Sequence, residues 1–357
     1  MLITSTLLGS SAELDTRIAT LELWLSSNPY SHKGRRLILL HLMEARLDRY
    51  ALSRQPEDID KAILTITEII LLPFPPLVDL YVYQLVVYRL SQLSQLLLIR
   101  FHLTSQLEDL KCSIDYSRHV YHSGLCLDRP IGLPRSRIII RLIKTLHSHV
   151  DLEAKSATVT RTIEEMVGLC RELLISDISG DDLVDVIVIL KDSFYVARGN
   201  THGQTIDQVV EYIREAIPRC PPGSHLASGA LADCLAIRVV RNVSIEDSQE
   251  AIALFDKIAT SQPSGDRTNP SRRAALFKAA NVARTQFALF PNLENLEVAM
   301  SRVRTALADP SLEDSPELAE YLEGLMRKRA EYFHLTHHRE MVSSSLHKRP
   351  PPHHSNR

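Results

Sequence analysis

The chain has 357 residues, of which 45% are hydrophobic and 24% charged, with only 12 glycines. Scarce glycine and 6% aromatic residues favour helix over sheet, because sheets need more turn residues. A net charge of −2 excludes bulk attraction to nucleic acid or to an anionic membrane. The five cysteines are odd in number and form no CxxC pair, which predicts buried thiols in the reducing cytoplasm.

The first residues, 1–11, form an N-terminal extension without the basic leader of a signal peptide. A helix is expected near 12–27. The best candidate for a membrane-spanning helix lies at 77–101. Polar residues, among them Gln84 and Arg89, recur there at helical intervals and would line one face of the helix. Burying those groups in hydrocarbon is costly, so we expect an amphipathic core helix and no membrane contact.

Six pairs of helices are expected to follow, each pair ended by a proline or glycine cluster. Their first helices are expected at 32–54, 77–103, 133–155, 181–199, 224–243 and 271–290, and their second helices begin near 57, 108, 161, 204, 246 and 294. A last helix near 316–336 completes about fourteen helices. The array therefore spans 12–336, with hinge candidates near 124–134 or 176–182, and the polar, proline-rich residues 337–357 are expected to be a disordered tail.

A weak internal repeat supports this division. Four segments share a pattern of Glu, then Asp or Asn, three variable residues, a small residue and an aliphatic one: Glu57–Ile63, Glu108–Ile114, Glu246–Ile252 and Glu294–Met300. Nine residues before the Asp or Asn stand Arg49, Arg100, Arg238 and Gln286, each followed by an apolar residue. We expect the Asp or Asn to accept hydrogen bonds from free backbone N–H groups at a helix start, and the small residue to let two helices approach.

These patterns predict an all-α fold, a right-handed α-solenoid of antiparallel helix pairs of the tetratricopeptide-like (TPR-like) kind. The motif R-[Y/F]-x-x, a short turn, E-D-[L/I]-x-x-A-I and a proline-bearing loop resembles the degenerate arrays of filamentous basidiomycete fungi, which often precede a caspase-like CHAT domain. The best matches are Arg49–Pro73, Arg100–Ser123, Arg238–Pro263 and Gln286–Pro310. The intervals here are longer and less regular than the standard unit. Nothing after 336 could hold a CHAT domain, so the resemblance implies a binding array without peptidase activity.

Catalytic motifs are missing from the sequence. There is no GxSxG elbow, no phosphate-binding glycine loop and no cysteine with a motif-bearing histidine. His334 and His338 lie one helical turn apart, but a third and a fourth ligand are not evident. We therefore expect no enzyme, no catalytic residue, no metal and no cofactor.

Basic residues recur on the predicted first helices. In superhelical arrays these helices line the concave groove, where arginines can receive acidic peptides or carboxylate termini. Alternatively, their stems lie on apolar surface and their heads pair with nearby carboxylates. The row comprises Arg35, Arg36, Arg46, Arg135, Arg137, Arg141 and Arg272. It continues in the candidate partner-binding residues Arg238, Arg241, Arg273, Lys278, Asn281 and Arg284, of which Lys278, Asn281 and Arg284 share one helical face.

The sequence thus predicts a non-enzymatic, cytoplasmic scaffold that binds a protein or peptide partner in a concave groove. One alternative is the regulatory part of a caspase-like fungal peptidase system. Another is a helical enzyme or a lipid-binding protein, for which an enclosed apolar pocket with buried ionisable groups would be diagnostic.

Overall fold

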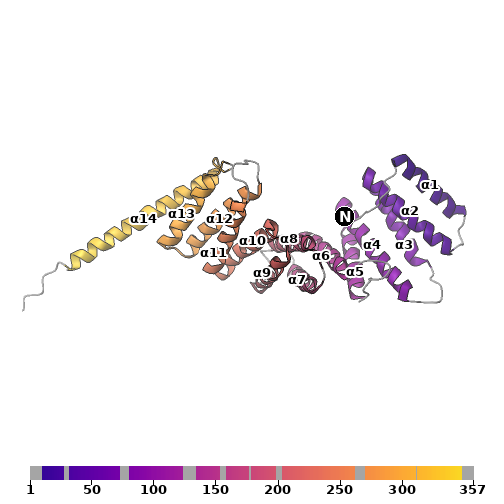
Figure 1. Cartoon of the computed structure of the whole chain (residues 1–357), viewed down its shortest axis with the longest axis horizontal. Helices are drawn as coiled ribbons and strands as arrows, with labels where there is room; N and C mark the ends of the chain where they lie inside the picture. The colour runs from indigo at the N-terminus through magenta and orange to yellow at the C-terminus, as the bar shows by residue number, and fades with distance from the viewer. Residues whose placement is uncertain are drawn as a thin grey trace, which may run out of the picture. The chain divides into compact units, whose positions relative to one another are not determined.

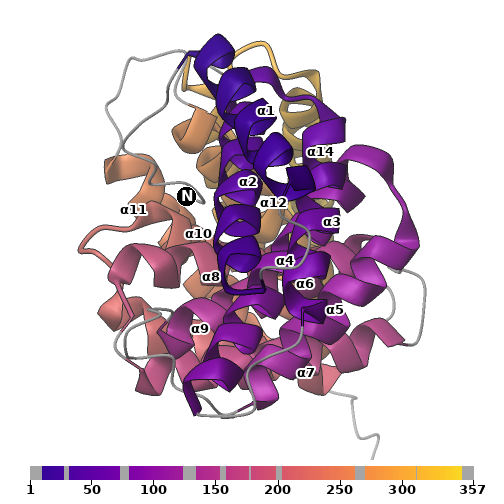
Figure 2. The ribbon, with the colours of Figure 1, turned by 90° about the vertical axis from the view of Figure 1, so that its right-hand side faces the viewer.

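The computed structural model describes residues 10–27, 32–72, 80–123, 134–152, 158–176, 178–197, 203–261, 270–310 and 312–347. In these ranges the chain forms fourteen α-helices, one short 3-10 helix and no strand (Figure 1). Within each part of the chain, consecutive helices pack on one another, beginning with α1 along α2 (Figure 2). The prediction of an all-α solenoid is therefore confirmed.

The helix pairs lie where the sequence predicts them, within a few residues. The first helices are α2 His32–Ser53, α4 Leu80–Thr104, α6 Arg135–Leu152, α8 Gly180–Ala197, α10 His225–Asn242 and α12 Pro270–Leu289. The second helices are α3 Pro56–Leu71, α5 Leu107–His122, α7 Thr158–Ile175, α9 Gly203–Ala216, α11 Ile245–Ser261 and α13 Leu293–Leu307. Helix α1 Ser11–Ser27 precedes them, η1 Ile217–Arg219 follows α9, and α14 Pro316–His347 comes last.

Helix α14 is longer than expected. The sequence analysis ends this helix near 336 and begins a disordered tail at 337, whereas α14 continues to His347. No proline stands between Pro316 and Pro350, so nothing in the sequence forces the helix to stop at 336. The rest of the predicted tail, 348–357, lies outside the described residues.

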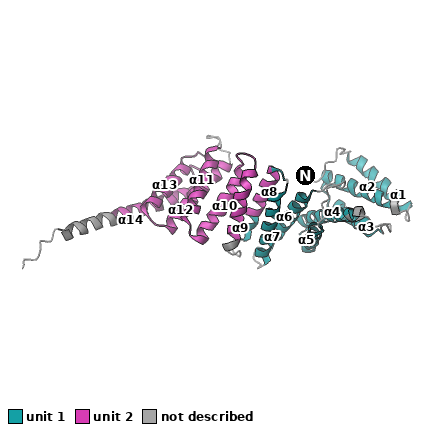
Figure 3. Cartoon of the chain, turned by 60° about the horizontal axis from the view of Figure 1, so that its bottom comes forward, with its two compact units in different colours: residues 1–179, 192–200 teal, residues 180–191, 201–357 magenta. Residues whose placement is uncertain are grey.

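The chain divides into two compact units (Figure 3). Unit 1 comprises Met1–Ser179 and Asp192–Asn200, and unit 2 comprises Gly180–Lys191 and Thr201–Arg357. The boundary at Ser179 falls within the hinge candidate 176–182, and most of the other candidate, 124–134, lies outside the described residues. A hinge motion at either place stays a prediction.

The small residues of the repeat lie in the core of their hairpins. Ala62, Ser113, Ala251 and Ala299 are all completely buried. A larger side chain at these positions would push the two helices of a pair apart. Their burial agrees with the predicted role of the small column, and the close approach of the two helices stays a prediction.

An arginine–aspartate pair joins the two helices of three hairpins. The arginine Nε and Nη2 atoms donate to both oxygens of an aspartate nine residues later, as in Arg100, whose Nε lies 2.7 Å from Asp109 Oδ2 and whose Nη2 lies 2.6 Å from Oδ1. The same pair, called the arginine clamp below, forms in Arg49–Asp58 and Arg238–Asp247. The three aspartates are almost fully buried. Hydrogen bonding to them raises the pKa of each arginine above its ordinary value.

The clamp corrects one expectation. We expected the aspartates to cap helix starts, but neither α3 nor α5 has a side-chain cap, and Asp58 and Asp109 accept guanidinium hydrogen bonds instead. The clamped hairpins also share a turn. Five residues after each arginine stands a residue with positive φ: Arg54 (55°), Ser105 (57°) and Val243 (51°).

The remaining nitrogen of each clamp arginine points to the preceding helices. Nη1 of Arg100 donates to Asp60 on α3 at 3.1 Å, and Nη1 of Arg238 donates to Asp207 on α9 at 3.3 Å. In the first clamp, Nη1 of Arg49 donates to Asp15 on α1 at 2.7 Å. Each clamp therefore ties its own hairpin to the helix before it.

Candidate partner-binding site

Several arginines in the basic row have intramolecular carboxylate partners. Arg35 donates to Glu68 at 2.6 Å, Arg46 to Glu22 at 2.6 Å, and Arg272 to Asp309 at 2.8 Å. Arg135 likewise pairs with Glu172, and this pairing holds the pKa of Glu172 below its usual range. For these residues the interpretation that basic heads pair with nearby carboxylates is the one that the contacts support.

Two of the candidate binding residues are paired in the same way. Arg238 belongs to a clamp, and its side chain is only 14% exposed. The ammonium group of Lys278 lies 2.7 and 2.8 Å from the two oxygens of Asp233 on α10, so it connects two first helices. A partner carboxylate would have to compete with Asp247 for Arg238 and with Asp233 for Lys278. Arg241 is half-buried near the end of α10.

The other three candidates lie on α12. Arg273 is exposed and makes no ion pair with a described residue. The side-chain oxygen of Asn281 is buried and has no hydrogen-bond donor in the described part of the chain. The guanidinium carbon of Arg284 lies 3.9 Å from the ring centre of Tyr321 on α14. Of the predicted face Lys278, Asn281 and Arg284, the last residue borders a cleft.

That cleft lies between α12 and α14 and has a volume of about 720 Å³. It is open, and both apolar and charged residues line it. The hydroxyl of Tyr332, one of these residues, donates to the carbonyl of Pro291 at 2.9 Å. Lys328 pairs with Glu331 at 2.8 Å, whereas no carboxylate among the described residues pairs with Arg284. The uncharged lining includes Phe287, Ala288, Pro291, Gly324 and Leu325, and the charged lining comprises Arg284, Glu320, Lys328 and Glu331.

A second basic site lies in unit 1, and the candidate set does not include it. Arg141 on α6 lines a cavity of about 110 Å³ together with Tyr88 and Gln92 of α4. Its Nη1 donates to Ser91 at 2.8 Å, and an amide oxygen of Gln95 turned toward it would accept from Nη1 at 2.7 Å. No described carboxylate pairs with Arg141, and burial lowers its pKa.

One feature of the sequence agrees with the lack of a described carboxylate partner for Arg141. No acidic residue stands three or four positions from Arg141 on its own helix, where such a partner would reach it.

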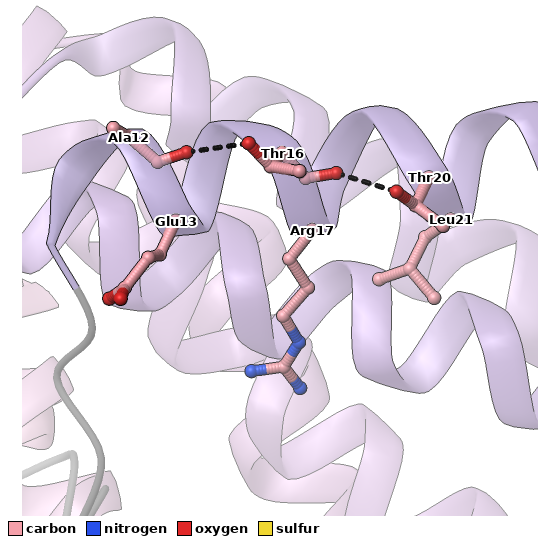
Figure 4. A pocket seen from close by; sticks show the side chains of 6 residues that line it. All are labelled: Ala12, Glu13, Thr16, Arg17, Thr20 and Leu21. Atoms are coloured by element: carbon pink, nitrogen blue, oxygen red, sulfur yellow. Dashed lines mark hydrogen bonds between the residues drawn. The ribbon is translucent and has the colours of Figure 1, made fainter.

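A hollow on α1 is less informative. Its lining residues all belong to this one helix, and the hydroxyls of Thr16 and Thr20 donate to the helix's own carbonyls at 2.9 and 2.8 Å (Figure 4). With its polar groups already bonded and no second element facing them, this surface offers no converging contacts for a ligand.

The described side chains contain no group of three or more His, Cys, Asp or Glu residues placed to hold a metal ion, and the side chain of His338 lies outside them. Among the described helices, none combines the length and apolar character needed to cross a bilayer.

Comparison with known proteins gives likenesses to solved structures alone. No family model and no curated protein matches the chain. A structure of Nro1, described as a hypoxic regulator of sterol synthesis and a nuclear import adaptor, matches 88% of this chain and 99% of its own, at 15% identity and a TM-score of 0.44. A second structure of the S. pombe import adaptor Nro1 matches 87% and 99%, at 14% identity and a TM-score of 0.46.

A designed self-assembling cyclic homo-oligomer matches 89% of this chain and 98% of its own, at 10% identity and a TM-score of 0.13. Likenesses at these levels carry no argument about function, which is therefore argued from the chain's own surfaces. The resemblance to the helical-repeat arrays of basidiomycete fungi stays a prediction.

Proposed function

We propose that the chain is a non-enzymatic helical-repeat scaffold that binds a segment of a protein partner in the cleft between α12 and α14. The observation that carries this proposal is the cleft itself, which combines apolar lining residues with an arginine that has no carboxylate partner among the described residues. Helix α12 is one of the first helices, on which the sequence predicted the binding surface.

The chemistry of the cleft suits a peptide with an apolar side chain next to a carboxylate. The apolar side chain would contact Phe287 and Leu325, and its burial would supply most of the affinity. The carboxylate would meet Arg284, whose guanidinium already stacks on Tyr321 and so loses little freedom on binding. A planar guanidinium can hold a carboxylate by two parallel hydrogen bonds.

The cytoplasm is the proposed compartment. Cys112, Cys170, Cys220 and Cys234 are free thiols, and free buried thiols suit a reducing environment. Burial raises the pKa of Cys112 and Cys220, which keeps both in the unreactive thiol form.

A steric block tests the cleft. Gly324 lines it, and a Cβ added there would meet no atom within 4 Å, so Gly324→Trp should place an indole at the cleft without a clash at the helix itself. Gly168 on α7 is the matched control, because it is also an exposed helical glycine with no atom within 4 Å of an added Cβ.

Peptides would be selected on the intact chain from a random displayed library and their affinities measured by fluorescence polarisation. We expect apolar–acidic peptides that bind at least about tenfold more weakly to Gly324→Trp and equally well to Gly168→Trp. Arg284→Gln should weaken acidic peptides more than their amidated analogues. Peptides that bind Gly324→Trp as tightly as the wild type would overturn the assignment of the cleft.

A further inference from the structure

The fourth hairpin, α12–α13, departs from the arginine clamp at every one of its positions. Gln286 stands where the arginine should be, and Asn295 stands nine residues later in place of the aspartate. The preceding-helix aspartate is replaced too, because Gln249 follows Asp247 by two residues just as Asp60 follows Asp58. Three charged groups have thus become three neutral amides.

The turn has changed with them. Five residues after Gln286 stands Pro291, whose ring excludes the positive φ found at the same position of the other three turns. Asn295 Nδ2 donates instead to the carbonyl of Phe290 at 2.8 Å, and Asn292 caps α13 by accepting from the Asn295 N–H at 2.8 Å. The hairpin is therefore closed by a different set of contacts, and it does not need an arginine for closure.

The replacement leaves one acceptor without a donor. Gln286 Nε2 donates to Asn295 Oδ1 at 2.9 Å, but the buried Oε1 of Gln286 has no partner among the described residues. Gln286 is only 3% exposed. An unsatisfied buried acceptor costs about 1–3 kcal/mol, so a ligand that supplies an N–H group here gains that energy.

A cavity of about 210 Å³ adjoins this acceptor between α11, α12 and α13. All three amides of the altered clamp line it. So do two carboxylates, Asp256 and Glu294, against a single guanidinium, that of Arg302, which lies 2.7 Å from Asp256. Its lining therefore has a surplus of negative charge.

The negative charge of Asp256 is only partly balanced by positive groups within this lining. Burial raises the pKa of Asp256, and the nearby Arg302 only partly opposes that shift. A second positive group in the cavity would favour the ionised carboxylate.

We propose that this cavity binds an arginine side chain of a partner protein. The three clamped hairpins hold a guanidinium between the same three positions, and the fourth keeps the space and the acceptors but lacks the arginine. A guanidinium offers five N–H donors in one plane, enough for Gln286 Oε1, the Gln249 amide oxygen and a carboxylate together. An ammonium group has fewer donors and no such plane. The proposal is independent of the α12–α14 cleft.

The test uses the full chain and a blocked tripeptide, acetyl-Gly-Arg-Gly-amide, titrated by amide chemical shifts in NMR. Matched probes carry lysine or the uncharged isostere citrulline in place of arginine. We expect millimolar binding of the arginine probe, with shifts in α11–α13, and at least about tenfold weaker binding of the citrulline probe. Binding of arginine and citrulline probes with equal affinity would overturn the proposal, as would the absence of any shift at millimolar arginine probe.

Two variants locate the effect. Gln286→Arg with Asn295→Asp restores a clamp in the chain itself and should abolish binding of the arginine probe while the helicity stays unchanged. Ala253→Trp, at an exposed alanine on the cavity wall, should block the probe even if that double variant fails to fold. Ala274→Trp, at an exposed alanine of α12 outside the cavity, is the control. Unchanged probe binding in Ala253→Trp would refute the site, whereas Gly324→Trp should leave this binding intact.

Discussion

The arginine clamp predicts that replacing Arg238, a candidate partner-binding residue in the sequence analysis, lowers the stability of its hairpin. In Arg238→Met the carboxylate of Asp247, whose side chain is 8% exposed, loses hydrogen bonds of 2.6 and 2.5 Å. Removing one partner of a buried ion pair costs about 3–5 kcal/mol. The contact to Asp207 adds little because that side chain is half exposed. We expect about 3 kcal/mol of lost stability in the α10–α11 hairpin.

The fourth hairpin supplies the comparison. Gln286→Met, at the equivalent position, removes one neutral hydrogen bond of 2.9 Å together with the unsatisfied Oε1 acceptor, so it should cost no more than about 1 kcal/mol. Arg273→Met removes an exposed arginine that makes no ion pair with a described residue, and it should change stability by less than about 0.5 kcal/mol.

Hydrogen exchange measured by mass spectrometry reports each hairpin separately. A loss of about 3 kcal/mol corresponds to roughly a hundredfold fall in amide protection, and it should be confined largely to peptides from α10 and α11. If Arg238→Met lowered protection less than about fivefold, or no more than Gln286→Met does, then the clamp would not be the stabilising element that its geometry indicates.

Three further predictions concern stability. Ala251→Leu should lower the urea midpoint by the equivalent of about 1–3 kcal/mol, because Ala251 is completely buried between helices. Arg135 lowers the folded-state pKa of Glu172. The stability that this ion pair contributes is present above the unfolded carboxyl pKa and is lost as the pH falls through the folded-state pKa. Glu172→Gln should therefore flatten the fall in melting temperature below about pH 5, and an unchanged profile would refute this. Gly229→Ala should stabilise the fold by about 0.5–1 kcal/mol and so raise the melting temperature. Gly180→Ala should lower the melting temperature, since the new Cβ would lie 3.0 Å from a backbone carbonyl oxygen. Equal shifts in the two variants would contradict this prediction.

The helices were predictable because their signals are local. Proline and glycine clusters separate the pairs, and the small column marks buried positions within them, so the start of α11 was expected at 246 and lies at Ile245. The same alignment placed Arg238 nine residues before Asp247 without revealing that they bond. Their pairing depends on the turn between them, and the positive φ of Val243 has no sequence signal, because valine rarely adopts it.

The candidate site was predictable only in part, because ion pairing across helices is a long-range property. Lys278 meets Asp233, 45 residues earlier, and Arg284 meets Tyr321 on the last helix. Nothing in the spacing along α12 separates the paired lysine from the stacked arginine. Arg141 was one member of a row in the sequence, and it stands out only after the helices around it are in place.

The contact from each clamp to the preceding helix has a consequence for how the array unfolds. In a chain of stacked units, cooperativity depends on the coupling between nearest neighbours. Arg238 couples α10 to α9 through Asp207, whereas the α12–α13 hairpin has no arginine at the equivalent position, and its second helix reaches α11 through the half-exposed Arg302–Asp256 pair. Both links are partly exposed ion pairs that add little energy. The last hairpin, which contributes to both proposed binding sites, is therefore held to the rest of unit 2 mainly by packing against α11 and by the contact of Lys278 with Asp233 on α10.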